Sequence, residues 1–244
     1  MATFVLIHGG GHGGWCWSPV ARLLRARGHD VFAPTLSGLA DRKHVLTPDT
    51  ALSTHIADIA NLIEYEDLSD VMLVGHSYGG MVITGAADRV IERIGHIVFL
   101  DAAIPMNGEA LVDVSPGLLT MAGSTRMVDG VELGLWPDVA AGAIYGLNGC
   151  EYEDWALSRL TPQPWKTVTE PLILSRPDAV AALPRTIINC ATSLKGRPEK
   201  LRERWIAAER VFTVDTGHDL MLTEPLQVAE MLNDVAVASG KKRA

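Results

Sequence analysis

One serine in this chain stands in a setting that could make it a nucleophile. Residues 71–80 read VMLVGHSYGG, in which an apolar, β-prone run breaks at Gly75 and a helix-compatible stretch follows. The pattern predicts a strand, a sharp turn and a helix, with Ser77 at the apex of the turn. Gly75, Gly79 and Gly80 are small enough to let strand and helix pack this closely, which leaves the hydroxyl exposed at the positive end of a helix.

A serine nucleophile needs a base, and the base needs an orienting acid. We predict His218 as the base, because it lies in VFTVDTGHDLMLTEP between the last predicted strand and the last helix, at the same sheet edge as Ser77. One usual position for the acid follows the strand in TIINCATSLKG, but Thr192 and Ser193 stand there. We therefore assign the acid to Asp101, which follows the strand in HIVFLD. The alternative is that Asp101 is a strand-end residue bonded to local amides.

Acyl transfer also requires amide donors for the oxyanion, and these are predicted at Gly10 and Tyr78. Such donors commonly come from the residue after the nucleophile and from the loop after the first strand. In the loop HGGGHGGW, Gly9 and Gly10 let the backbone turn its amides inward, and we place Gly9 and His12 beside the substrate. For His12 a purely structural role in the loop is the alternative. The loop has neither the Lys-Ser/Thr ending of a P-loop nor a G-x-G-x-x-G pattern with a ribose-binding acid, so we do not expect it to bind a nucleotide.

Short strands alternate with helical patterns around these residues, which predicts an α/β fold with a mostly parallel sheet flanked by helices. A helix over 51–66 carries Leu52, Ile56, Ile59 and Ile63 on one face. Residues 1–102 and 184–244 are predicted to form the core. The predicted strands are 4–7, 30–36, 71–75, 96–101, 185–191 and 210–214, and further helices are predicted at 18–27, 197–208 and 225–238.

Residues 103–183 interrupt the alternation and are predicted to form an inserted helical cap, because the segment is too long for a structureless loop. We place three of its tryptophans in the substrate site, Trp136, Trp155 and Trp165, and the cap also carries Leu118, Leu119, Met121 and Leu135. These side chains favour a substrate with an apolar or aromatic acyl or alcohol portion. The alternative is that they pack the interior of the cap.

Composition excludes several classes of protein. The net charge is −8 and the basic residues cluster only at 241–243, so no nucleic-acid partner is expected. No apolar run approaches about 18 residues, so no membrane span is expected. The three cysteines cannot all pair and match no metal-site spacing. Together with the lack of a secretory signal pattern, this predicts a cytoplasmic protein without a metal.

With these residues identified, the chain resembles the α/β-hydrolase superfamily, and within it the branch of plant methylesterases, hydroxynitrile lyases and their bacterial esterase relatives. The similar segments are FVLIHGGGHGGWCW, GHSYGG, VFLDAAIP and TGHDLMLTEP, in that order. The resemblance implies a Ser-His-Asp hydrolase that acts on small esters beneath a helical cap without a cofactor. Members of this branch often form dimers, so the resemblance is compatible with a homodimer.

The same resemblance separates esterases from lyases at two positions. Lyase members tend to replace the glycine after the first-strand histidine with threonine or asparagine, and one group adds a lysine after the catalytic histidine. This chain has Gly9 and Asp219 at these positions, and both favour an esterase. Ser193 departs from the plant pattern, which again gives the role of the acid to Asp101.

We therefore predict a carboxylic ester hydrolase that acts on a small-molecule ester through an acyl-enzyme intermediate. The alternatives are a hydroxynitrile lyase or another non-hydrolytic enzyme of this fold, a lactonase, or a ligand-binding receptor that retains the fold without turnover. These residues do not distinguish ester, thioester, lactone and amide substrates.

Overall fold

The centre of the molecule is a six-stranded parallel sheet with strand order β2-β1-β3-β4-β8-β9. The computed structural model describes residues 1–117, 125–137 and 141–241. The strands are β1 (Thr3–Ile7), β2 (Asp30–Phe32), β3 (Val71–His76), β4 (Ile94–Leu100), β8 (Arg185–Cys190) and β9 (Arg210–Val214). The predicted α/β class with a parallel sheet is confirmed.

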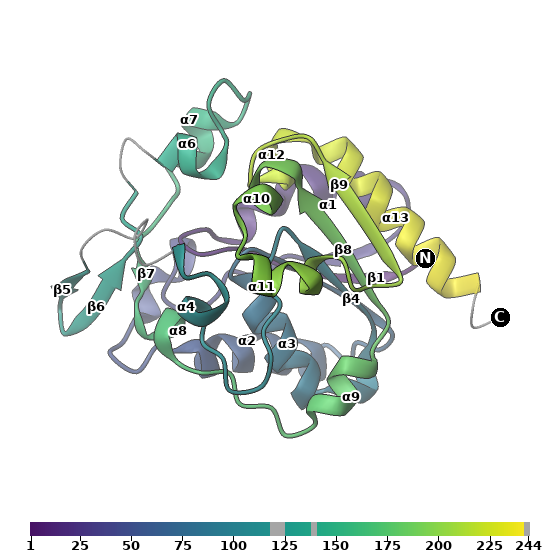
Figure 1. The fold of residues 1–244 in the computed structure, drawn as a ribbon, viewed down its shortest axis with the longest axis horizontal. Coiled ribbons are helices and arrows are strands. Elements are labelled where there is room, and N and C mark those ends of the chain that lie inside the picture. The colour runs from purple at the N-terminus through teal and green to yellow at the C-terminus, as the bar shows by residue number, and fades with distance from the viewer. Residues whose placement is uncertain (118–124, 138–140, 242–244) are drawn as a thin grey trace.

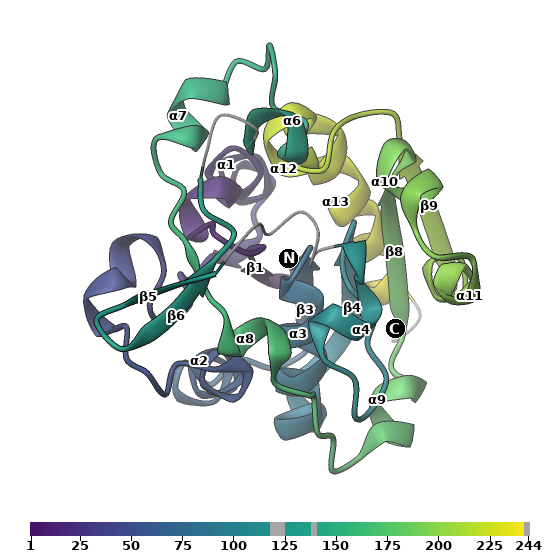
Figure 2. The same cartoon turned by 60° about the vertical axis from the view of Figure 1, so that its left-hand side comes forward.

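Helices cover both faces of this sheet (Figure 2). On one face lie α1 (Ser18–Ala26) and α13 (Pro225–Lys241), and on the other lie α2 (Leu52–Tyr65) and α3 (Gly79–Arg89). The predicted apolar face of α2 is confirmed, since Leu52, Ile56, Ile59 and Ile63 are all buried in the core on that side. No helix within the described ranges combines the length and apolar character needed to cross a membrane.

Shorter helices fill the connections. They are η1 (Gly14–Trp17), η2 (Ala40–Val45), η3 (Ile91–Arg93), α9 (Pro177–Ala182), α10 (Ala191–Gly196), α11 (Glu199–Arg202), η4 (Glu203–Trp205) and α12 (Leu220–Thr223). The prediction of one helix over 197–208 is therefore wrong. Pro198 is the N-cap of α11, which is one turn long, and the next turn is the separate 3-10 helix η4. The predicted strand over 30–36 ends at Phe32, two residues before Pro34, which has no N–H for the ladder.

The segment 103–183 contains strands as well as helices. Its described elements are α4 (Leu111–Val114), β5 (Arg126–Val128), β6 (Val131–Gly134), α6 (Ala141–Tyr145), α7 (Glu153–Leu157), β7 (Gln163–Pro164) and α8 (Lys166–Thr169), followed by α9. A small antiparallel sheet, β5-β6-β7, was not predicted. Asp129 and Gly130 connect β5 to β6, both at positive φ of 49° and 81°, as a two-residue hairpin turn requires. Figure 1 shows β5, β6, α6 and α7 gathered at one end of the molecule.

The sheet register aligns the carboxyl ends of the strands that carry the candidate residues. His76 at the end of β3 pairs with Leu100 at the end of β4, and Leu100 in turn pairs with Ile188 of β8. Ser77 and Asp101 therefore leave the sheet side by side, although 24 positions separate them in the chain. The amide of Asp101 donates to the carbonyl of Ile188 at 2.7 Å, which extends the ladder by one residue.

Close backbone packing holds the start of α3 against the chain after β4. The amide of Ala103 donates to the carbonyl of Ser77 at 2.9 Å. A Cβ atom on Gly80 would lie 1.9 Å from the carbonyl oxygen of Ala103, so no side chain fits there. The fold therefore requires a glycine at position 80.

We expect Gly80→Ala to lower the free energy of unfolding by about 3 kcal/mol or more, because the new methyl group forces the backbone apart. Gly240→Ala, near the end of α13 with open space around it, is the matched control and should change stability by about 1 kcal/mol or less. Urea unfolding of both variants measures this. Equal stabilities would contradict the packing described here.

Candidate active site

Ser77 occupies the sharp turn between β3 and α3. Its φ of +53° lies in the left-handed region, which non-glycine residues adopt rarely and at a cost. The turn is held by a hydrogen bond from the Ser77 amide to the carbonyl of Leu100 at 3.3 Å. The strained backbone presents the side chain at the end of the sheet, next to a cavity.

The structure brings Ser77, His218 and Asp101 into one hydrogen-bonded chain. The Nε2 atom of His218 lies 2.9 Å from the Oγ atom of Ser77. The Nδ1 atom of the same ring lies 2.5 Å from Oδ2 of Asp101. Since a carboxylate only accepts, Nδ1 carries the proton and Nε2 is left to accept from the serine hydroxyl.

The carboxylate of Asp101 is only 3% exposed, so its charge requires compensation. Its second oxygen, Oδ1, accepts from the guanidinium of Arg197 and from the amide of Cys190, the latter at 3.3 Å. Burial raises the pKa of this carboxyl group, but His218, Arg197 and the Ser193 side chain together lower it from 3.8 to about 2. Asp101 is thus ionised throughout the physiological range of pH.

Arg197 is a site residue that the sequence did not reveal. Its NH1 group donates to the side-chain oxygen of Asn189 at 3.1 Å, and its guanidinium lies 4.3 Å from the ring centroid of Trp205. It stands 96 positions from Asp101 in no motif, so no local signal could have identified it. Ser193, which stands where the plant pattern has its acid, lines the same cavity and contributes to the lowered pKa of Asp101.

His218 has the electrostatics of a base that is ready to accept a proton. Burial lowers the pKa of its imidazole, but the hydrogen bond to Asp101 and the charge of that carboxylate outweigh burial and raise the pKa above 6.5. Asp219 raises it further, whereas Arg197 lowers it. The net result is an imidazolium that is stabilised once it forms.

Gly10 and Tyr78 both face the cavity beside Ser77. The glycine-rich loop that carries Gly10 is held from two sides: the amide of Gly11 donates to Oε1 of Gln163 in β7 at 2.8 Å, and the ring of His8 bonds the carbonyl of Gly9 at 2.8 Å. The side chain of Tyr78 is buried and its hydroxyl bonds the ring of His55 at 2.8 Å. The hydroxyl of Tyr78 is therefore occupied, and the oxyanion role predicted for this residue rests on its backbone amide.

The cavity beside Ser77 has a volume of about 390 Å³ and a largely apolar wall. Among the described residues, the wall includes Leu111, Val114, Leu135, Ile144 and Trp205. Four of these five come from the segment 103–183, which therefore shapes the space next to the serine. Leu135 was expected here, whereas Leu118, Leu119 and Met121 lie outside the described residues.

Five residues that the sequence placed beside the substrate are not in the described wall of this cavity: Gly9, His12, Trp136, Trp155 and Trp165. Gly9 packs behind the serine turn, and His12 is fully buried. The ring of Trp155 meets Trp15 edge-on at 5.2 Å, and Trp136 lies under the guanidinium of Arg126 at 4.8 Å. Trp165 packs against Gly134. Trp136 and Trp165 thus contact residues of the segment itself, whereas Trp155 contacts Trp15 outside it. Their place beside the substrate stays a prediction.

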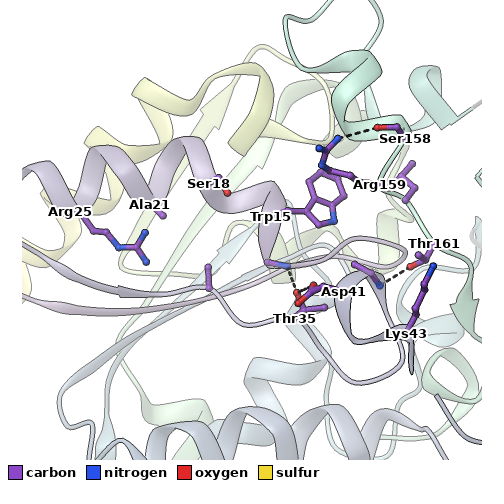
Figure 3. A pocket seen from close by; sticks show the side chains of 14 residues that line it. Trp15, Ser18, Ala21, Arg25, Thr35, Asp41, Lys43, Ser158, Arg159 and Thr161 are labelled. Carbon is purple, nitrogen blue, oxygen red and sulfur yellow. Dashed lines mark hydrogen bonds between the residues drawn. The ribbon is translucent and has the colours of Figure 1, made fainter. Parts of the chain in front are cut away.

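A second, more open pocket of about 710 Å³ lies beside Gly14, at the end of the glycine-rich loop. Figure 3 shows Trp15, Arg25, Lys43 and Arg159 around it, and a hydrogen bond joins Thr35 to Asp41 at 2.6 Å. Its described wall contains none of Ser77, His218 and Asp101. The smaller cavity is therefore the one that the reactive groups face.

Known proteins share this fold and its elements over nearly the whole chain. The family model described as "Alpha/beta hydrolase family" matches residues 4–231. The carbendazim hydrolyzing esterase of Nocardioides sp. (strain SG-4G) is 36% identical, over 95% of this chain and 98% of that protein. Methylesterase 10 of Arabidopsis thaliana is 26% identical, over 96% of this chain and 91% of that protein. Tomato Methylketone Synthase I complexed with 2-tridecanone superposes with a TM-score of 0.80 at 21% identity, covering 98% of each chain.

If Asp101 orients the histidine, Asp101→Asn should lower kcat by about 10⁴-fold, because the imidazole loses its tautomer and the charge that stabilises imidazolium. Ser193→Ala removes a hydroxyl that lowers the pKa of Asp101 only slightly beside His218 and Arg197, and it should cost about tenfold or less. Rates on a chromogenic short-chain ester, with thermal melts to check folding, measure both. An Asp101→Asn enzyme with near-normal kcat would show that the acid lies elsewhere.

The pH dependence of kcat/KM reports the free His218, which must be neutral to accept a proton. Activity should therefore fall as pH drops through a pKa above 6.5. Arg197 lowers this pKa, so Arg197→Met should move the acid limb to higher pH, whereas Arg197→Lys keeps the charge and should move it less. A limb that stays in place or moves to lower pH in Arg197→Met would refute the electrostatic role of the guanidinium.

Proposed function

The chain belongs to the α/β hydrolase family and is a carboxylic ester hydrolase, and we propose that it cleaves small, largely apolar or aromatic esters through Ser77, His218 and Asp101. The observation that carries this proposal is the chain of hydrogen bonds from Asp101 through His218 to Ser77, at 2.5 and 2.9 Å, beside an apolar cavity. Esterases recur among the relatives that match nearly the full chain, which supports the same reaction.

The reaction would proceed through an acyl-enzyme. The Oγ atom of Ser77 attacks the ester carbonyl while Nε2 of His218 takes the hydroxyl proton. The same nitrogen then gives the proton to the leaving alcohol. Water then attacks the acyl carbon while it loses a proton to His218. As the bond from the acyl carbon to Oγ of Ser77 breaks and the acid leaves, His218 returns the proton to Oγ. Asp101 holds the imidazolium, and the amides of Gly10 and Tyr78 hold the oxyanion in both halves of the reaction.

The wall of the cavity supports a small, apolar or aromatic substrate, since side chains such as Leu111, Ile144 and Trp205 offer no charge to a ligand. The names of the relatives supply starting compounds. We propose carbendazim, after the Nocardioides protein, and methyl esters of aromatic acids, after the methylesterases, as the first members of a test panel.

The three cysteines bear on where the protein is located in the cell. Cys16, Cys150 and Cys190 are all free, and two of them are buried, which supports the expected cytoplasmic location.

Size-exclusion chromatography with light scattering would decide between a monomer and the homodimer that the resemblance leaves open.

The covalent step is tested with Ser77→Ala. This variant should lose about 10⁶-fold in kcat, a loss of the size seen when a triad nucleophile is removed, while its fold is unchanged by circular dichroism. The native enzyme mixed with a chromogenic ester should show a burst of product and a mass increase equal to the acyl group on Ser77. Retained turnover in Ser77→Ala would end the proposal.

The panel should also contain lactones, thioesters and a cyanohydrin, because the alternatives differ in their substrates. Release of cyanide from mandelonitrile without ester cleavage would identify a lyase, and faster turnover of lactones than of open esters would identify a lactonase. Tight binding of panel members without turnover would identify a receptor. We expect ester cleavage to exceed the other activities.

A further inference from the structure

A buried ion pair lies behind the reactive groups and takes no part in the mechanism described above. His12 and Asp219 are 207 positions apart, and both are 0% exposed. The Nε2 atom of His12 lies 2.9 Å from Oδ2 of Asp219. Burying two such groups is costly unless geometry and hydrogen bonds compensate, so a pair of this kind often serves something other than stability.

The hydrogen bonds of His12 place donors on both ring nitrogens. Its Nδ1 atom lies 2.7 Å from the carbonyl oxygen of Gly10, which can only accept. Its Nε2 atom faces a carboxylate whose pKa, although raised by burial, is lowered below its usual value by His12. With Asp219 ionised, His12 donates from both nitrogens and connects Gly10 directly to Asp219.

Each end of this connection adjoins a group that the proposed mechanism uses. Gly10 supplies an amide for the oxyanion, and Asp219 directly follows His218. The backbone of Asp219 is itself fixed, because its amide donates to the carbonyl of Tyr145 at 2.9 Å and its carbonyl accepts from the amide of Leu222 at 2.8 Å. A movement of the His12–Asp219 pair would therefore shift the oxyanion donor relative to the base.

His76 joins the same buried cluster to the nucleophile. It immediately precedes Ser77, and its Nε2 atom donates to the carbonyl of His218 at 3.0 Å. Burial, followed by the neighbouring His218, lowers the pKa of His76 to about 3, so the ring is neutral. Oδ1 of Asp219 makes no hydrogen bond with any described residue, and Nε2 of His76 lies 3.8 Å from it. The cluster thus joins three loops, those of His12, Ser77 and His218, and leaves one carboxylate oxygen of Asp219 without a hydrogen bond among the described residues.

We infer that His12 and Asp219 are positioning residues, which fix the distance between the Gly10 amide and the His218 ring on either side of Ser77. The inference rests on the proposed function. The oxyanion exists only in the transition state, so misplacement of its donor should lower kcat and leave KM almost unchanged. A pair that only stabilised the fold would change the amount of active enzyme and not the rate of each active molecule.

The test uses Asp219→Asn, His12→Gln and the double variant in the full chain. Active sites are counted with a fluorophosphonate that labels Ser77, and kcat and KM are measured per labelled site on a chromogenic ester. Displacements of up to 1 Å predict a loss in kcat of about 10- to 100-fold, with KM changed less than about threefold. An alkyl boronic acid that mimics the tetrahedral state should bind more weakly by the same factor. The double variant should lose no more than the worse single variant.

His29→Gln is the matched control, because His29 is also buried and bonded through both nitrogens, to the amide of Ala2 and to Asn233, away from the cavity. It should keep normal kcat per labelled site. If Asp219→Asn fails to fold, Asp219→Glu keeps the charge beside His12 but displaces the carboxylate by one methylene, and the same loss in kcat is expected.

Several results would overturn the inference: normal kcat per labelled site in the folded variants, a rise in KM at constant kcat, or losses that multiply in the double variant. None of them would affect the proposed function, because native turnover and labelling of Ser77 would remain. Failure of the proposed function would instead appear as turnover in Ser77→Ala.

Discussion

The ionised carboxylate of Asp101 is the feature around which the rest of the site is arranged. It follows a strand of seven buried residues and is itself almost inaccessible to water. An unpaired charge there would cost several kcal/mol or force the group to take up a proton. The structure compensates it on both oxygens, with His218 on one and with Arg197 and the amide of Cys190 on the other. The arrangement that stabilises the charge also fixes the ring of His218.

The segment 103–183 is part of this arrangement and does more than cover the cavity. Gln163 bonds the glycine-rich loop through the amide of Gly11, and the carbonyl of Tyr145 accepts from the amide that follows His218. Leu135 lies against Gly10. The glycine-rich loop and the loop of His218, to which we assign the proposed oxyanion donor and base, are therefore both held by this one segment. We expect changes in the segment to alter catalysis as well as substrate choice.

Much of the site was predictable because its signals are local. The residues around Ser77 specify a strand, a turn and a helix within a few positions, and the parallel register then places Asp101 beside it. Arg197 was not predictable, because its role depends on the distance to a residue far along the chain. The turn at Asp129 and Gly130 carried a hairpin signal in VDGV that pointed to β5 and β6. The orientation of Trp155 could not be predicted, since composition does not say whether an aromatic ring faces a cavity or a neighbouring side chain.

The buried histidines show why one imidazole in this fold is suited to proton transfer. Burial lowers the pKa values of His8 and His76 to about 3 and of His55 to about 4, so these rings are neutral. Each also bonds a backbone carbonyl, which fixes its tautomer for structural use. The side chain of His218 is 22% exposed, and its pKa is raised even though burial opposes this, because its partner is a carboxylate and not a carbonyl. His12 also bonds a carboxylate, but its other nitrogen bonds the carbonyl of Gly10. His218 combines a charged acceptor on one nitrogen with the hydroxyl of Ser77 on the other, which is the arrangement that proton transfer to the ring requires.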